Sequence, residues 1–117
     1  MEITNHEDLG SLRRQAKEFE DDLLTAKRQF ERQAAQEEES AQALHHGLDQ
    51  VSIFANQMND QQTLSALSEL SFADNQDKQR YLQELTEQYT LQQRRIKRQL
   101  ILVNEQIATV TKREEQK

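Results

Sequence analysis

The fold follows from residues 81–110, which read YLQELTEQYTLQQRRIKRQLILVNEQIATV. Apolar side chains recur in this segment at steps of three, four or seven residues, at Leu82, Leu85, Tyr89, Ile96, Leu100, Val103, Ile107 and Val110. In a helix these steps place side chains on one side, where a partner helix can bury them. The pattern therefore predicts a long amphipathic helix, which we expect over residues 76–113.

A second stripe with the same period lies upstream and predicts a first helix over residues 5–58. Its apolar positions are Leu9, Leu12, Ala16, Phe19, Leu23, Ala26, Phe30, Ala34, Ala41, Leu44, Leu48, Val51, Ala55 and Met58. Thr4 and Glu7 have the spacing of a capping box, which favours a helix start at residues 4–6. Gly47 interrupts the pattern, either as a tolerated residue or as a place where the connecting segment approaches the backbone.

A short apolar segment with a polar break on each side connects the two stripes. Residues 59–62 predict the first break, and residues 63–72 predict a separate short helix. Residues 73–77 predict the second break, in which Asp74 or Asn75 is suited to cap the last helix.

Each predicted helix contains one place where two steps of four residues follow each other: Ala26, Phe30 and Ala34 in the first, and the polar Gln92 with Ile96 and Leu100 in the second. If these register slips face each other, Phe30 lies opposite Ile96 and the free ends of the two helices align. We therefore predict a single all-α domain over residues 1–117. It is an antiparallel two-helix hairpin, coiled-coil-like, with a short helical segment in its connection.

Composition limits the chemistry and the compartment. Only 34% of the 117 residues are hydrophobic, below the roughly 45–50% of globular domains, which suits two helices joined along one seam. The absence of Cys excludes a disulfide framework and a thiolate metal site. No signal-peptide pattern or transmembrane run is present. We expect a cytoplasmic protein, or one exported with its partner by a system that reads no signal peptide.

Motifs for catalysis or cofactor binding are missing, so we expect a non-enzyme without cofactors. His45, His46 and Asp49 are the nearest approach to a metal cluster, but a zinc site needs three or four converging ligands, so we expect no bound metal. The basic residues 94–98 lack interleaved aromatic residues in a chain of net charge −6, so we expect no nucleic-acid binding.

Apolar side chains outside the two stripes indicate a surface that binds another helical protein. One group consists of Leu24, Ile101 and Leu102, and a second group near the connection includes Ile53, Phe54 and Phe72. The alternative for the second group is a small local core beneath the connection.

A small, acidic, Cys-free helical hairpin resembles the WXG-type proteins of type VII secretion. It is more similar still to the small helical partners of LXG toxins. The Trp-x-Gly turn of the WXG proteins is absent, because the chain has no Trp. The resemblance implies a targeting chaperone that binds the helical N-terminal domain of an LXG toxin, together with a second small helical protein. Independently of the resemblance, we expect that the chain can form a homodimer when the partner is absent.

Two other classes of protein remain open. A structural coiled-coil or stalk protein would assemble with itself. A prefoldin-like holdase would bind many unfolded chains through exposed helix tips.

Overall fold

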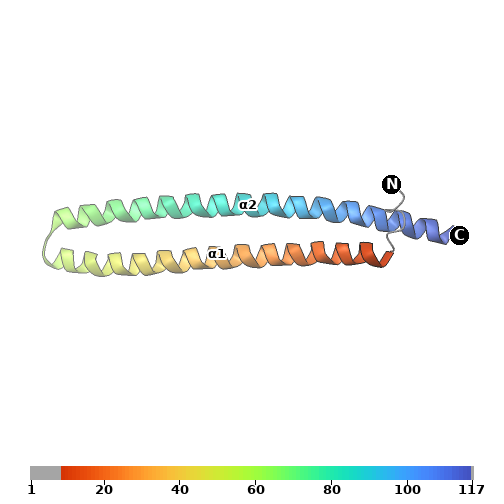
Figure 1. The fold of residues 1–117 in the computed structure, drawn as a ribbon. Helices are drawn as coiled ribbons and strands as arrows, with labels where there is room; N and C mark the ends of the chain where they lie inside the picture. Colours follow the sequence, from red (N-terminus) through yellow and green to blue (C-terminus); the bar gives the residue numbers. More distant parts are fainter. Residues whose placement is uncertain (1–8, 117) are drawn as a thin grey trace. The chain divides into compact units, whose positions relative to one another are not determined.

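The computed structural model describes residues 9–116, which form an all-α hairpin of two antiparallel helices (Figure 1). Helix α1 covers Leu9–Gln57 and helix α2 covers Gln61–Glu115. The hairpin predicted from the two apolar stripes is thus confirmed. The expected helix start at residues 4–6 lies outside the described residues. Neither helix, as described, holds an apolar stretch that could cross a membrane.

Helix α1 ends in a Schellman motif. The Asp60 N–H donates to the carbonyl of Ala55 at 2.9 Å, and the Asn59 N–H donates to the carbonyl of Asn56 at 3.1 Å. Asn59 has a φ of 54°, in the left-handed region that Asn tolerates better than most residues. The chain therefore reverses without a glycine.

Asp60 also begins α2, because its carboxylate caps the new helix. The Thr63 N–H donates to Asp60 Oδ1 at 3.1 Å, and the Thr63 hydroxyl donates to Asp60 Oδ2 at 2.6 Å. The hydroxyl, followed by the backbone N–H, lowers the pKa of Asp60 below its ordinary value. The break predicted at residues 59–62 is confirmed as the turn between the helices.

The predicted second break, at residues 73–77, is wrong, because α2 continues through it without interruption. Residues 63–72 are helical as expected, but they are the first part of α2 rather than a separate helix. Asp74 and Asn75 do not cap a helix. Both residues lie close to His45 of α1 instead. Residues 73–77 include neither Gly nor Pro, so nothing in this segment stops the helix.

The chain divides into two compact units, each containing part of both helices. Unit 1 joins α1 up to Gln29 with α2 from Gln88 onward. Its seam, the line of buried and half-buried side chains between the helices, consists mainly of predicted stripe residues, although Gln15 and Gln93 are half-buried and belong to neither predicted stripe. The stripe residues in the seam include Leu12, Ala16, Phe19, Leu23 and Ala26 on α1 and Ile96, Leu100, Val103 and Ile107 on α2.

Unit 2 covers Phe30–Glu87 and contains the turn. Its seam on α1 keeps Ala41, Leu48 and Ala55 of the predicted stripe but differs from the stripe by one residue at two positions. Leu44 and Val51 are exposed, while His45 and Ser52 are half-buried in their place. The seam residues of unit 2 from Ala41 onward are Ala41, His45, Leu48, Ser52 and Ala55 on α1 and Leu64, Leu67, Ser71, Asp74, Lys78, Leu82 and Leu85 on α2.

The predicted pairing of Phe30 with Ile96 is wrong, because the contacts between the helices in unit 2, which contains Phe30, follow a different register. That pairing requires residue numbers across the seam to add up to 126. The contacting residues Glu38 and Lys78 add up to 116, and His45 and Asn75 add up to 120. The turn at Asn59 is too short to allow the offset between the helices that a sum of 126 requires. The geometry of the turn, and not the register slips, therefore sets which residues of the two helices face each other.

Two leucines of α2 test the seam. Leu85→Ala should lower the free energy of unfolding by about 2–4 kcal/mol, because Leu85 is only 8% exposed and its loss leaves a cavity. Leu91→Ala is the matched control, with an exposed side chain, and should change it by less than about 0.5 kcal/mol. Denaturant unfolding measures both. Equal losses would mean that the seam is misassigned.

Candidate functional site

The seam of unit 2 is unusually polar. From His45 on α1 to Lys78 on α2, five of its positions carry polar or ionisable side chains: His45, Ser52, Ser71, Asp74 and Lys78. Small or polar side chains bury little apolar area, so this part of the hairpin gains less from the hydrophobic effect than unit 1 does.

His45 connects the two helices. Its Nε2 lies 3.1 Å from Asn75 Oδ1 and 3.9 Å from Asp74 Oδ2. Asp74 Oδ2 is buried, and no group in the described part of the chain donates a hydrogen bond to it. An unsatisfied buried carboxylate oxygen reduces stability, so Asp74 weakens the seam where it sits. On the same helix turn, Gln50 Nε2 donates to His46 Nε2 at 3.2 Å.

Glu38 and Lys78 form an ion pair across the helices, with Nζ and Oε2 2.6 Å apart. The hydrogen bond from Lys78 and its positive charge lower the pKa of Glu38 below its ordinary value. Glu38 is an exposed residue of α1. The helix periodicity of α1 alone does not show that Lys78 reaches it from α2.

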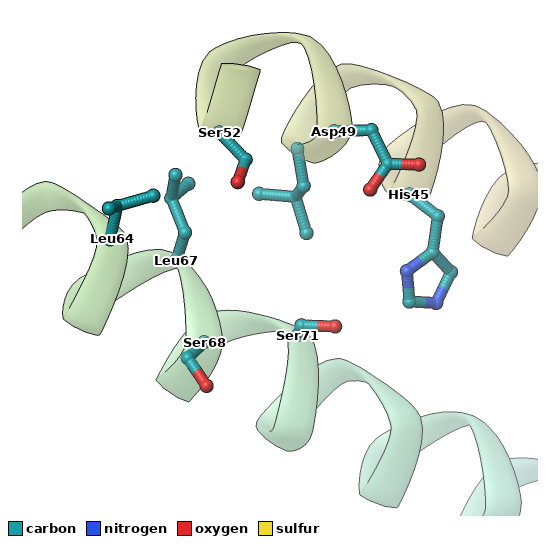
Figure 2. A pocket seen from close by; sticks show the side chains of 8 residues that line it. His45, Asp49, Ser52, Leu64, Leu67, Ser68 and Ser71 are labelled. Carbon is teal, nitrogen blue, oxygen red and sulfur yellow. The ribbon is translucent and has the colours of Figure 1, made fainter. Parts of the chain in front are cut away.

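A shallow pocket of about 160 Å³ lies beside this polar seam. His45 and Asp49 from α1 and Ser71 from α2 are among its lining residues, and Leu67 points toward α1 (Figure 2). Pockets that enclose small molecules are roughly 300–1,000 Å³, so this one is too small to hold a substrate away from water. No group of three or more potential metal-binding side chains occurs among residues 9–116.

The two sides of unit 2 differ in polarity. Successive helical residues are rotated by about 100°, so residues just before a seam position and residues just after it point to opposite sides. The antiparallel arrangement places the "before" positions of both helices on the same side. This apolar face contains Leu44, Gly47, Val51 and Phe54 on α1 and Ala66, Leu70, Ala73 and Tyr81 on α2.

The opposite side, the polar face, consists of the positions just after the seam. It holds Glu38, Gln42, Asp49, Ser68, Asn75 and Gln79, together with Ile53 and Phe72. The pocket and the contacts from His45 to Asn75 and from Glu38 to Lys78 are on this side. The apolar face is therefore the larger continuous apolar surface of unit 2.

All six predicted partner-binding residues are exposed, from 46% for Leu24 to 65% for Phe72; the others are Ile53, Phe54, Ile101 and Leu102. The structure does not gather them into two surfaces. Ile53 and Phe54 are neighbours in a helix and lie on different faces of unit 2. Ile101 follows seam residue Leu100 whereas Leu102 precedes seam residue Val103, so these two also diverge. Their role in binding stays a prediction.

Sequence reasoning missed three members of the apolar face: Leu44, Val51 and Tyr81 are 44%, 47% and 40% exposed. A signal for the α1 side was present, because Leu44, Gly47, Val51, Phe54 and Met58 recur at steps of three and four. A Cβ at Gly47 would meet nothing within 4 Å, so of the two interpretations Gly47 is a tolerated residue and the connecting segment does not approach it closely.

No protein family matches this sequence, and neither a curated protein nor a solved structure shows significant similarity to it. The likeness to the partners of LXG toxins therefore stays a prediction drawn from length, pattern and composition.

Removal of the Asp74 carboxylate tests the cost of the polar seam. Asp74→Ala and Asp77→Ala gain the same helix propensity on the same helix, but Asp77 is exposed. Asp74→Ala should therefore raise the free energy of unfolding by about 1 kcal/mol more than Asp77→Ala. Urea unfolding of both variants measures the difference. A smaller gain for Asp74→Ala would show that His45 stabilises the buried carboxylate.

The ion pair predicts a dependence on pH. Because the pKa of Glu38 is lowered in the folded state, its contribution is complete above the ordinary value of 4.5 and is lost as the pH falls through the lower folded value. The stability difference between the wild type and Glu38→Gln should therefore shrink in acid. Glu39→Gln, an exposed neighbour, is the control. A difference for Glu38→Gln that stays constant in acid would contradict the pairing.

Proposed function

We propose that this protein is a non-enzymatic adaptor that binds another helical chain through unit 2. The observation that carries the proposal is the distribution of polar and apolar side chains in that unit. Polar side chains such as His45 and Asp74 occupy its seam, while large apolar side chains such as Phe54 and Leu70 face outward.

The energetic argument is direct. A large apolar side chain contributes roughly 1.5–3 kcal/mol when it is fully buried, and the exposed members of the apolar face contribute little of this in the free hairpin. Contiguous exposed apolar side chains of this kind mark interaction sites more often than chance placement. A partner helix lying along the apolar face would bury them.

Two features support a role outside catalysis. The pocket beside His45 and Asp49 is shallow and about 160 Å³ in volume. The carboxyl groups of Glu38 and Asp60 have lowered pKa values, caused by an ion pair and a helix cap. Both groups are ionised at neutral pH, so neither is suited to donate a proton.

The proposed partner is the helical N-terminal domain of an LXG toxin, bound in the cytoplasm before type VII export. The support is the resemblance to small helical toxin partners and the hairpin fold, which suits a bundle of helices from several chains. A second small helical protein would complete the complex.

Mixing experiments test this function. The purified N-terminal domain of an LXG toxin from the same genome should form one complex of fixed stoichiometry with the protein, measured by size-exclusion chromatography with light scattering. Binding should also raise the melting temperature of the hairpin, because the partner binds only the folded state.

The control is an unfolded protein of similar size, which an adaptor should leave unbound. Binding of that protein would favour a holdase, and growth of the free protein into long assemblies would favour a stalk. If every LXG domain tested leaves the protein unbound, the proposed partner is wrong.

A further inference from the structure

Unit 2 is strongly anionic. Residues 33–77 contain no Lys or Arg. They contain eight carboxylates: Glu37, Glu38, Glu39, Asp49, Asp60, Glu69, Asp74 and Asp77. By contrast, residues 1–29 and 88–117, which make up unit 1, hold 12 basic and 10 acidic residues in the sequence. The negative charge of the protein is therefore concentrated where the apolar face is exposed.

The two ionisable residues that immediately precede seam positions on this side of α2 are both carboxylates, and Arg80 lies one position further from the seam. Asp77 precedes seam residue Lys78 and Glu84 precedes seam residue Leu85, so both carboxylates flank Tyr81 on this side. The Lys78 ammonium group forms its ion pair with Glu38, which lies on the polar face. Its positive charge is therefore not directed to the apolar face. A partner lying on the apolar face therefore meets carboxylates beside the apolar side chains.

The shape of the α1 side suits a helix. Leu44, Val51, Phe54 and Met58 extend along about four helical turns at steps of seven, three and four residues. Open space surrounds the position of a Cβ at Gly47, between Leu44 and Val51, so a partner backbone can approach closely there. Amphipathic helices bind such surfaces through side chains spaced by three and four residues.

We propose that the apolar face binds a cationic amphipathic helix, with apolar side chains against Val51 and Phe54 and Lys or Arg side chains beside Asp77 and Glu84. This deepens the proposed adaptor function, on which it rests, by naming the chemistry of the partner and the face that receives it. A second copy of this chain fits less well, because two anionic units 2 would repel each other.

Fluorescence anisotropy with designed peptides tests the proposal on the full-length protein. One labelled peptide of about 20 residues carries Leu on one helical face and Lys on the other, long enough to span the α1 stripe. A second peptide replaces each Lys with Glu. The protein variants are Phe54→Glu on the apolar face and Ile53→Glu on the polar face, two adjacent residues with similar exposures of 64% and 61%.

The Lys peptide should bind the wild type and Ile53→Glu with affinities within about twofold, and Phe54→Glu at least about tenfold more weakly. The direction of the change in affinity for Phe54→Glu is informative. If binding of the cationic peptide were purely electrostatic, the added carboxylate would strengthen it. The Glu peptide should not bind, and salt should weaken binding of the Lys peptide. Circular dichroism should show both variants as helical as the wild type, since neither residue is in the seam.

Three results would overturn the proposal: equal affinities of Phe54→Glu and Ile53→Glu, binding of the Glu peptide as tight as the Lys peptide, or a homodimer that Phe54→Glu dissociates. An LXG toxin domain that binds Phe54→Glu and the wild type equally would leave the adaptor function intact and remove this face. Selective binding of the Lys peptide without binding of any toxin domain would support this face as a site for cationic helices and would remove the proposed toxin partner.

Discussion

The geometry of the turn at Asn59 and Asp60 constrains the rest of the hairpin. Asn59 ends α1 in a left-handed conformation, and Asp60 both donates its N–H to Ala55 and caps α2 through Thr63. A reversal that ends one helix and starts the next within three residues leaves no freedom to slide one helix along the other. The position of every seam residue in unit 2 follows from this turn.

The register set by the turn is also electrostatically favourable in unit 1. Its boundary falls at Gln29 on α1 and Gln88 on α2, so at equal rise per residue Ile96 is level with Asp21. The basic residues 94–98 are then level with an acidic run at residues 20–22. The pairing of Phe30 with Ile96 would instead have placed these basic residues beside Arg28 and Arg32. Attraction between the segments therefore acts in the same direction as the turn.

The fold class and most of the seam of unit 1 could be predicted because one strong apolar period in each helix admits a single reading. The seam of unit 2 was harder to predict from the sequence. A stripe through Leu44 and Val51 and a stripe through His45 and Ser52 both have steps of three and four residues. Apolar periodicity favoured the first, and the structure places the second in the seam. The deciding contacts, from His45 to Asn75 and from Glu38 to Lys78, join residues 30 and 40 positions apart, which no local pattern reports. For the same reason the apolar face was missed as a surface.

The polarity of unit 2 links stability to binding. If Leu44 and Val51 occupied the seam, unit 2 would resemble unit 1 more closely and its apolar face would lose these two side chains. With His45 and Asp74 there instead, the seam retains an unsatisfied carboxylate oxygen and the apolar side chains remain exposed to water. Both effects lower the stability of the free protein, and burial of the apolar face by a partner reverses the second. A helix that binds this face therefore stabilises unit 2 in proportion to the apolar area it covers, which couples folding of the turn end to recognition.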